Sequence, residues 1–319
     1  MNPSFFALVE DRIQLVEGRM RLQSADYHPD LQAVLTYLLS SGGKRIRPTV
    51  TLLAGGMLDA DSDSLLNLAA AVELLHTATL VHDDLIDGAM LRRGIPTLNT
   101  RWSSAATVLA GDYIFARAAT FAAATKSVDL QKIFADTLAT IVSGEITQLF
   151  TSRGKINRAD YYRRIYAKTA SLFEACTHCA SLISPVNSTI IEKMKTFGYE
   201  IGMAFQIVDD ILDFTGDQTT VGKPVASDLR QGLVTLPAIY YAEANPDNVE
   251  LKAVLNGNID EDRMNRLVRL IRTSGAINKA MEEAKEFVAR GIESISEMPD
   301  NEEHRALAAL AHYIVDREI

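Results

Sequence analysis

The chain has 319 residues, of which 47% are apolar and 23% are charged, and its net charge at pH 7 is −9. This is the composition of an ordinary globular protein with ample core, and the negative balance argues against a nucleic acid as partner. No uninterrupted run of about 18 apolar residues occurs, so no transmembrane helix is expected. The first residues lack the basic start and apolar core of a signal peptide, and we therefore expect a cytoplasmic protein.

Apolar residues recur at helical spacing along the chain, and the alternation typical of strands is nearly absent. The clearest predicted helix runs over 65–85, with Asp63 or Ser64 as its N-cap. Further helices are predicted at about 31–40, 48–58, 104–125, 129–150, 158–183, 188–214, 234–244, 260–273, 276–296 and 302–317. Several of them are apolar on more than one face, which is typical of a bundle with buried central helices.

No low-complexity linker divides the chain. We therefore predict an all-α protein, folded as a single-domain helical bundle over residues 1–319. The longest loop-like segment of the second half is 216–232, which contains Lys223 and Arg230. Loops of this length in compact proteins are often lids or binding loops.

Cys176 and Cys179 enclose His178 in a C-x-x-C pattern. A zinc site would need two further ligands at suitable spacing, and the sequence has no second C-x-x-C. A redox motif would need a nearby strand, and the surrounding sequence is helical. We predict that both cysteines are buried small residues of a helix.

Two copies of one acidic pentad, Asp-Asp-x-x-Asp, are the most informative feature of the sequence. They occupy residues 83–87 and 209–213, and each follows a long apolar run. Residues four apart on a helix share a face, so the outer carboxylates of each pentad project together and repel each other. Such hard oxygens suit Mg²⁺, which usually keeps several waters and is completed by substrate phosphates. Two solvated, Asp-rich helix ends are the alternative, which the apolar residues inside and before each pentad disfavour.

Basic residues are concentrated in short clusters, which suggests a small anionic ligand. They are Lys44, Arg45, Arg47, Arg92, Arg93, Lys168 and Lys223. His76 and Gln206 precede the pentads by seven and three residues, so both face the pentad side of their helices. His76 could equally be a core histidine.

Paired carboxylates alone would also fit glycoside hydrolysis, but that chemistry leaves the basic clusters unexplained. Carboxylates together with arginine and lysine fit a diphosphate held through Mg²⁺ on one side and by guanidinium groups on the other. The sequence has no Walker A motif and no Gly-x-Gly-x-x-Gly before a helix, so a nucleotide is not expected. Apolar helices beyond the acidic residues favour a diphosphate with a hydrophobic tail.

The sequence resembles the trans-type polyprenyl diphosphate synthases. The matching segments are GGKRIRP (42–48), ELLHTATLVHDDLID (73–87), RRGIPT (92–97), GDYIFARA (111–118), KTASLF (168–173), FQIVDDILDF (205–214), GKPVASDL (222–229) and TLP (235–237). They occur in the order found in that family. Terpene cyclases share the fold but carry only one such Asp-rich helix and lack the first and third segments. The resemblance implies the isoprenoid synthase fold, a helical bundle around a central cavity.

The resemblance also implies roles for individual residues. The metal ligands would be Asp83 and Asp87 for two Mg²⁺ ions and Asp209 for a third, with Asp213 as a further candidate. The metal-bound waters would be supported by Asp84, Asp210 and Asp213. The allylic diphosphate would be bound by Arg92, Lys168 and Lys223. The diphosphate of isopentenyl diphosphate would be bound by Lys44, Arg47, His76 and Arg93. The reacting carbons would face Thr169 and Gln206.

Chain length and assembly are further expectations from the resemblance. Ala78 and Thr79, just upstream of Asp83, are small where short-chain members place a bulky aromatic residue, which predicts medium or long products such as quinone side chains. Leu233 stands where short-chain relatives usually carry a lysine, and longer-chain relatives often lack it too. A homodimer is expected, because the 104–150 region is too apolar for a solvated surface on every face. A small partner subunit and contact with a membrane surface for product release stay open.

Two alternatives remain at this stage. A geranylgeranyl or farnesyl diphosphate synthase would take the floor of its tail pocket from Phe115 or Phe121 on another helix. A non-catalytic partner subunit would carry degenerate pentads, whereas both pentads are complete here.

Overall fold

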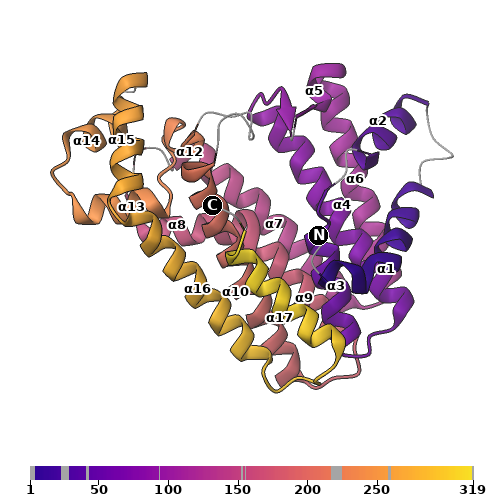
Figure 1. Cartoon of the computed structure of the whole chain (residues 1–319). Helices are drawn as coiled ribbons and strands as arrows, with labels where there is room; N and C mark the ends of the chain where they lie inside the picture. The colour runs from indigo at the N-terminus through magenta and orange to yellow at the C-terminus, as the bar shows by residue number, and fades with distance from the viewer. Residues whose placement is uncertain are drawn as a thin grey trace. The chain divides into compact units, whose positions relative to one another are not determined.

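The computed structural model describes residues 4–22, 29–40, 43–92, 94–151, 154, 156–216, 225–257 and 260–317, and helices dominate it (Figure 1). The first helices are α1 (Ser4–Leu22), α2 (Pro29–Ser40), α3 (Ile46–Met57), α4 (Ser62–Ile86), α5 (Leu98–Arg101), α6 (Ser104–Ala124) and α7 (Val128–Thr151). A helical segment follows, made of α8 (Arg158–Ile165), the π-helical turn η1 (Tyr166–Ala170) and α9 (Ser171–Leu182). The remaining helices are α10 (Ser188–Thr215), α12 (Ser227–Arg230), α13 (Leu236–Ala244), α14 (Val249–Leu255), α15 (Glu261–Thr273), α16 (Ala276–Ile295) and α17 (Glu302–Val315).

The predicted all-α class is confirmed. Within the described residues the strands are limited to β1 (Leu91–Arg92) and β2 (Ile95–Pro96), which pair antiparallel after α4. The chain divides into two compact units. Unit 1 comprises Met1–Leu138, Ala175–Lys195 and Glu297–Leu310, and unit 2 comprises Ala139–Glu174, Thr196–Ser296 and Ala311–Ile319.

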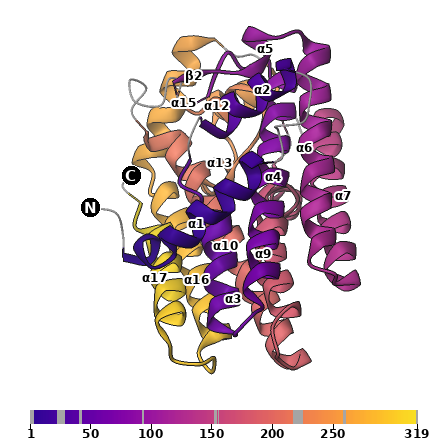
Figure 2. The same cartoon turned by 90° about the vertical axis from the view of Figure 1, so that its right-hand side faces the viewer.

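Helix α4 is the centre of unit 1. It packs along α6 and also contacts α3 and α1, as Figures 1 and 2 show. Leu68 and Leu75 are fully buried, and every residue from 65 to 75 is buried, because neighbouring helices cover α4 on several sides. Such all-round burial explains why apolar residues fill α4 rather than one stripe of it.

The N-cap of α4 differs from the prediction. Asp61, not Asp63 or Ser64, is the cap, and its side chain accepts a hydrogen bond from the Ser64 N–H at 2.8 Å. Asp63 lies inside the first turn, where a carboxylate is favoured by the helix dipole. Among the described residues α4 alone is long and apolar enough to cross a membrane. The search of the sequence for an uninterrupted apolar run did not select it, because polar residues interrupt the apolar sequence of the helix. However, 72% of its most apolar window is buried inside the protein, as expected of a core helix.

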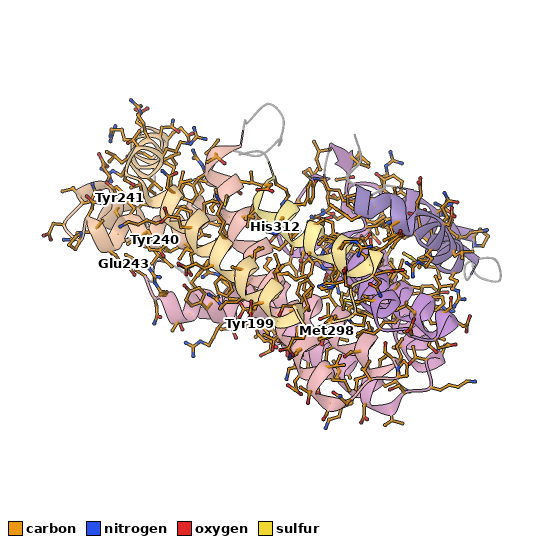
Figure 3. All side chains as sticks on the ribbon, turned by 60° about the horizontal axis from the view of Figure 1, so that its bottom comes forward. Tyr199, Tyr240, Tyr241, Glu243, Met298 and His312 are labelled. Carbon is orange, nitrogen blue, oxygen red and sulfur yellow. The ribbon has the colours of Figure 1, made fainter. Side chains whose placement is uncertain are left out.

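Unit 2 is held at one end by a polar cluster on α8, α13 and α16. Figure 3 labels Tyr240 and Glu243 on α13, which lies beside α16. Arg158 Nη2 donates to Glu243 at 2.9 Å, and the Tyr240 hydroxyl donates to Glu283 at 2.5 Å. The Tyr162 hydroxyl donates to the same Glu283 carboxylate. These bonds join three helices that are distant in sequence.

Several elements were absent from the sequence prediction. Helix α1 was missed, although its buried Phe5, Val9, Val16 and Met20 recur at helical spacing. The predicted helix 158–183 is interrupted by the π turn η1. The loop-like segment 216–232 contains the short helix α12. The other predicted helices agree with the structure to within a few residues at their ends.

Candidate active site

Both pentads lie in the last turns of long helices, the first in α4 and the second in α10. A helix C-terminus carries partial negative charge, and carboxylates placed there are disfavoured unless a cation is close. Each pentad therefore adds three carboxylates to an already negative helix end. This arrangement favours cation binding at each end.

In the first pentad the middle aspartate is paired with an arginine of the same unit. Arg92 Nε lies 2.8 and 2.9 Å from the two carboxylate oxygens of Asp84, and Arg92 Nη2 lies 2.7 Å from Oδ1. Asp84 is buried, whereas Asp83 is partly exposed and Asp87 is exposed as the C-cap residue of α4. The ion pair holds the Arg92 guanidinium against the middle aspartate of the pentad.

The predicted cations of the first basic cluster lie near α4 in unit 1. Arg47, in the first turn of α3, places Nη1 3.1 Å from Nε2 of His76 on α4. An arginine only donates, so Nε2 is the acceptor in this contact, and the ring proton of a neutral His76 is on Nδ1. Lys44 is exposed in the loop before α3. The structure thus brings Arg47 and His76 together, and their role in binding substrate stays a prediction.

In the second pentad the outer aspartates have polar partners of their own. Arg317 Nη1 lies 2.9 Å from Oδ1 of Asp209, and the Arg317 guanidinium also stacks 4.2 Å from the centroid of the Phe205 ring. Asp213 accepts backbone N–H bonds from Ser227 at 3.0 Å and Asp228 at 3.3 Å. Asp213 therefore anchors the start of α12 in addition to its predicted role beside a metal.

The middle aspartate of the second pentad is buried in a chain of hydrogen bonds. Asp210 accepts from the Tyr161 hydroxyl at 2.8 Å and from Gln206 Nε2 at 2.8 Å. Gln206 Oε1 accepts in turn from the Thr169 hydroxyl at 2.5 Å. The pKa of Asp210 is raised to about 8, mainly by burial and to a smaller extent by the negative charge of Asp228. Thr169 and Gln206, both predicted to face the reacting carbons, are thus held against each other.

The π turn η1 carries Lys168 and Thr169. The Lys168 ammonium lies 3.1 Å from the Glu145 carboxylate, and the Thr169 side chain is buried. Glycines let neighbouring helices come close to the turn: a Cβ on Gly144 would lie 2.5 Å from Ala167 Cβ, and one on Gly202 would lie 2.6 Å from Ala170 Cα. Single π turns are frequent at functional sites because they reorient side chains within a helix.

The residues present fit a divalent cation of the magnesium type. Among the described residues no three His, Cys, Asp or Glu side chains form a ready-made metal cluster. Mg²⁺ seldom needs one, because it is usually held by one or two carboxylates, waters and substrate phosphates. The outer aspartate pairs, 83 with 87 and 209 with 213, supply such carboxylates at helix spacing.

Two predicted site residues, Arg93 and Lys223, lie outside the described residues. Sequence reasoning missed Arg317 and Tyr161 altogether. Arg317 follows an apolar helix and gave no signal, since its partner Asp209 is 108 residues away. Tyr161 precedes Lys168 by seven residues, two helical turns, and that spacing could have placed it near the site.

The cysteines behave as predicted. Cys176 and Cys179 are free and buried in α9. Burial raises the pKa of Cys176 to about 12 and raises that of Cys179 as well. Neither thiol is therefore a candidate nucleophile or metal ligand.

The chain is similar to known proteins over nearly its whole length. The family model for polyprenyl synthetase matches residues 28–271. The heptaprenyl diphosphate synthase component 2 of Geobacillus stearothermophilus is 35% identical over 99% of this chain and 98% of its own. The nonaprenyl diphosphate synthase of Mycobacterium tuberculosis is 33% identical over 98% of this chain and 94% of its own. The crystal structure of a polyprenyl synthase from Caulobacter crescentus, complexed with calcium and isoprenyl diphosphate, matches with a TM-score of 0.90 at 33% identity, over 99% of this chain and 97% of that one.

The helical fold, the two pentads and these matches together define an all-α prenyltransferase. The chain belongs to the polyprenyl synthetase family. The family resemblance seen in the sequence is thereby confirmed.

Proposed function

We propose that the protein condenses isopentenyl diphosphate with an allylic diphosphate and so makes a medium- or long-chain trans-polyprenyl diphosphate. The observation that carries this proposal is the pair of complete pentads, each at a helix C-terminus, in a chain of the polyprenyl synthetase family. The hepta- and nonaprenyl names of the similar proteins support the longer products.

The cofactor we propose is Mg²⁺, about three ions with substrate bound, which Asp83, Asp87, Asp209 and Asp213 would hold. When bound, the metal neutralises the diphosphate and promotes its departure from the allylic carbon. The Caulobacter structure is complexed with calcium and isoprenyl diphosphate, which supports the use of a divalent cation and a diphosphate substrate here. Arg92, fixed by Asp84, and Lys168, beside Glu145, are the described cations that add charge to the leaving diphosphate.

The residues of the chain account for the remaining steps. The allylic C–O bond breaks, the double bond of isopentenyl diphosphate attacks the resulting cation, and a proton is lost to the departing diphosphate. Thr169 and Gln206 present oxygen dipoles that stabilise the developing positive charge. Arg47 and His76 bind the diphosphate of isopentenyl diphosphate, and their mutual contact fixes both groups before substrate arrives.

Product length depends on the face of α4 that leads to Asp83. Thr79, four residues before Asp83, shares that face and is partly exposed, whereas Ala78 is fully buried. Thr79→Phe should therefore obstruct a growing tail and shift the products towards farnesyl or geranylgeranyl length. Thr77→Phe is the matched control: both threonines bond to a backbone carbonyl of α4 and both are partly exposed, but Thr77 points to another side. Equal product lengths in the two variants would contradict this route for the tail.

Assembly is a proposal of the same kind. Val142, Ile146 and Leu149 of α7 recur at helical spacing and are 44%, 51% and 51% exposed, and Phe150 beside them is 81% exposed. An apolar stripe of this kind on a surface favours self-association, and we assign it to a homodimer. The name component 2 of the Geobacillus relative supports the alternative, a heteromeric assembly.

One experiment tests these proposals together. The purified chain is incubated with Mg²⁺, farnesyl diphosphate and isopentenyl diphosphate, and the product alcohols are sized. Products longer than geranylgeranyl, lost on chelation of the metal, are expected. If the pure protein binds both diphosphates but is inactive, the proposal of a homodimer is replaced by that of a heteromeric assembly. A protein that binds neither diphosphate would contradict the proposed function.

A further inference from the structure

Arg45 lies between the two predicted phosphate ligands Lys44 and Arg47 but does not share their environment. Its Nη1 donates to Glu73 Oε1 at 2.6 Å and its Nε donates to Glu17 Oε1 at 3.0 Å. The side chains of Arg45 and Glu73 are only 12% and 7% exposed. Burial alone would lower the pKa of Arg45, but the carboxylates of Glu73 and Glu17 outweigh it and the pKa is raised. The guanidinium is thus committed to two protein carboxylates.

The backbone of Arg45 is strained. Its φ of 49° and ψ of 36° are left-handed, a conformation that costs a residue with a Cβ free energy. Arg45 is also the N-cap residue of α3 and makes no side-chain cap bond. Strain of this kind persists only where surrounding interactions hold it, and it is concentrated at functional sites. The ion pairs to α1 and α4 supply those interactions.

Two links join this loop to one face of α4. Arg45 reaches Glu73, and Arg47 reaches His76 three residues further along the same helix. The left-handed turn at Arg45 directs the chain from Lys44 into the first turn of α3, where Arg47 lies. The orientation of Lys44 and Arg47, the two predicted phosphate ligands, therefore depends on the backbone conformation of Arg45.

We infer that Arg45 is a positioning residue for the diphosphate of isopentenyl diphosphate. Its buried pairs with Glu73 and Glu17 hold the left-handed turn that orients Lys44 and Arg47, and Arg45 itself does not bind the substrate. The inference rests on the proposed function and deepens it, because it names a residue that orients the ligands of one of the two substrates.

The test compares Arg45→Asn with Arg19→Gln. Asparagine tolerates the left-handed conformation better than other residues, so Arg45→Asn removes the ion pairs with little added backbone strain. Arg19 is a matched control because it also joins α1 to α4, through Asp63 and Asn67, each at 2.5 Å, but contacts neither Arg45 nor Glu73. Binding of isopentenyl diphosphate without allylic substrate is measured by calorimetry, together with kcat, both KM values and the urea midpoint.

Arg45→Asn should raise the Kd and KM for isopentenyl diphosphate about tenfold, the loss expected when one charge-assisted phosphate bond is misplaced. The allylic KM should stay within about twofold, since binding of that substrate uses other residues. Arg19→Gln should lower the urea midpoint and leave both KM values unchanged. Arg45→Lys keeps the charge but loses the planar guanidinium group. Its Kd and KM for isopentenyl diphosphate should lie between those of Arg45→Asn and wild type. If Arg45→Asn does not fold, Arg45→Lys and Glu17→Gln carry the same comparison.

An unchanged Kd for isopentenyl diphosphate in a folded Arg45→Asn protein would overturn the inference, and so would an equal rise in both KM values. Those results leave wild-type condensation intact and so do not touch the proposed function. Failure of the proposed function is a different observation, namely a wild-type protein that binds neither diphosphate.

Discussion

The two pentads have the same residues at the same spacing, but their middle aspartates lie in opposite environments. Asp84 faces a guanidinium, with Arg92 contacting both of its oxygens at 2.8 and 2.9 Å. Asp210 is buried with neutral donors, Tyr161 and Gln206, and its pKa is raised to about 8. A repeated motif therefore does not imply repeated surroundings, since the residues around each pentad decide which groups face its middle carboxylate.

The arginines that pair with the two pentads also differ in their place along the chain. In the first pentad Asp84 pairs with Arg92, eight residues further along and on the short strand β1. In the second pentad Asp209 pairs with Arg317, across 108 residues of sequence. The first arrangement is local, whereas the second depends on the tertiary fold.

The largest expected effect falls on both pentads equally. Asp83→Ala and Asp209→Ala should each lower kcat by about 10²–10³, because each removes charge that stabilises the leaving diphosphate. Asp136 is an exposed aspartate of α7, and Asp136→Ala is the control, which should leave kcat unchanged. Steady-state kinetics with circular dichroism checks both points, and near-wild-type turnover in either pentad variant would refute a shared role.

The pH dependence of stability should report on the buried Asp210 of the second pentad. The unfolded Asp210 has an ordinary pKa near 3.8, so between about pH 4 and pH 8 the folded state holds a proton that the unfolded state has lost. The contribution of Asp210 to the stability of the metal-free protein should accordingly fall as the pH rises through this window, by up to a few kcal/mol. Asp210→Asn should remove this fall, as measured by urea unfolding at several pH values in a chelating buffer. An unchanged pH dependence in Asp210→Asn would contradict a buried Asp210 that holds its proton in this window.

Glycines close to the pentads should give the next largest effect. Gly202→Ala places a Cβ 2.6 Å from the Ala170 backbone, which cannot yield without moving the π turn, and should cost about 1–3 kcal/mol. Gly111→Ala, in unit 1, meets the His82 ring instead, and a partly exposed side chain can rotate away. Gly18→Ala on α1 meets nothing within 4 Å and should stabilise by about 0.5–1 kcal/mol. Urea midpoints test this ranking. A loss of stability in Gly111→Ala as large as that in Gly202→Ala would contradict it.

The smallest expected effect concerns Arg317. Its pair with the 40% exposed Asp209 is worth roughly 0.2–1 kcal/mol, as for other solvent-accessible ion pairs. Arg317→Gln should therefore strengthen Mn²⁺ binding in the presence of inorganic diphosphate by no more than about fivefold. Arg305→Gln, whose partner Asp300 is distant in sequence from both pentads, is the control. Weaker metal binding in Arg317→Gln would show that the guanidinium assists the metal rather than competes with it.

Local patterns were sufficient for most of the helices and for the pentads, because periodicity and spacing are properties of short segments. The π turn was not predictable from residues 158–183, since the glycines that permit its close packing are on other helices. The Asp84–Arg92 pair could have been found from the sequence, being eight residues apart. The network of Tyr161, Asp210 and Gln206 could not, because it depends on two helices meeting at buried positions.

The buried cysteines have a practical consequence for all these measurements. Thiol reagents attack the thiolate, and a raised pKa together with complete burial leaves almost none available in Cys176 and Cys179. A single cysteine introduced at an exposed position such as Val128, which is 78% exposed, should therefore be the site that takes a fluorophore or spin label in the folded protein. Spectroscopic reporters of substrate binding can be attached to this enzyme without first replacing its native thiols.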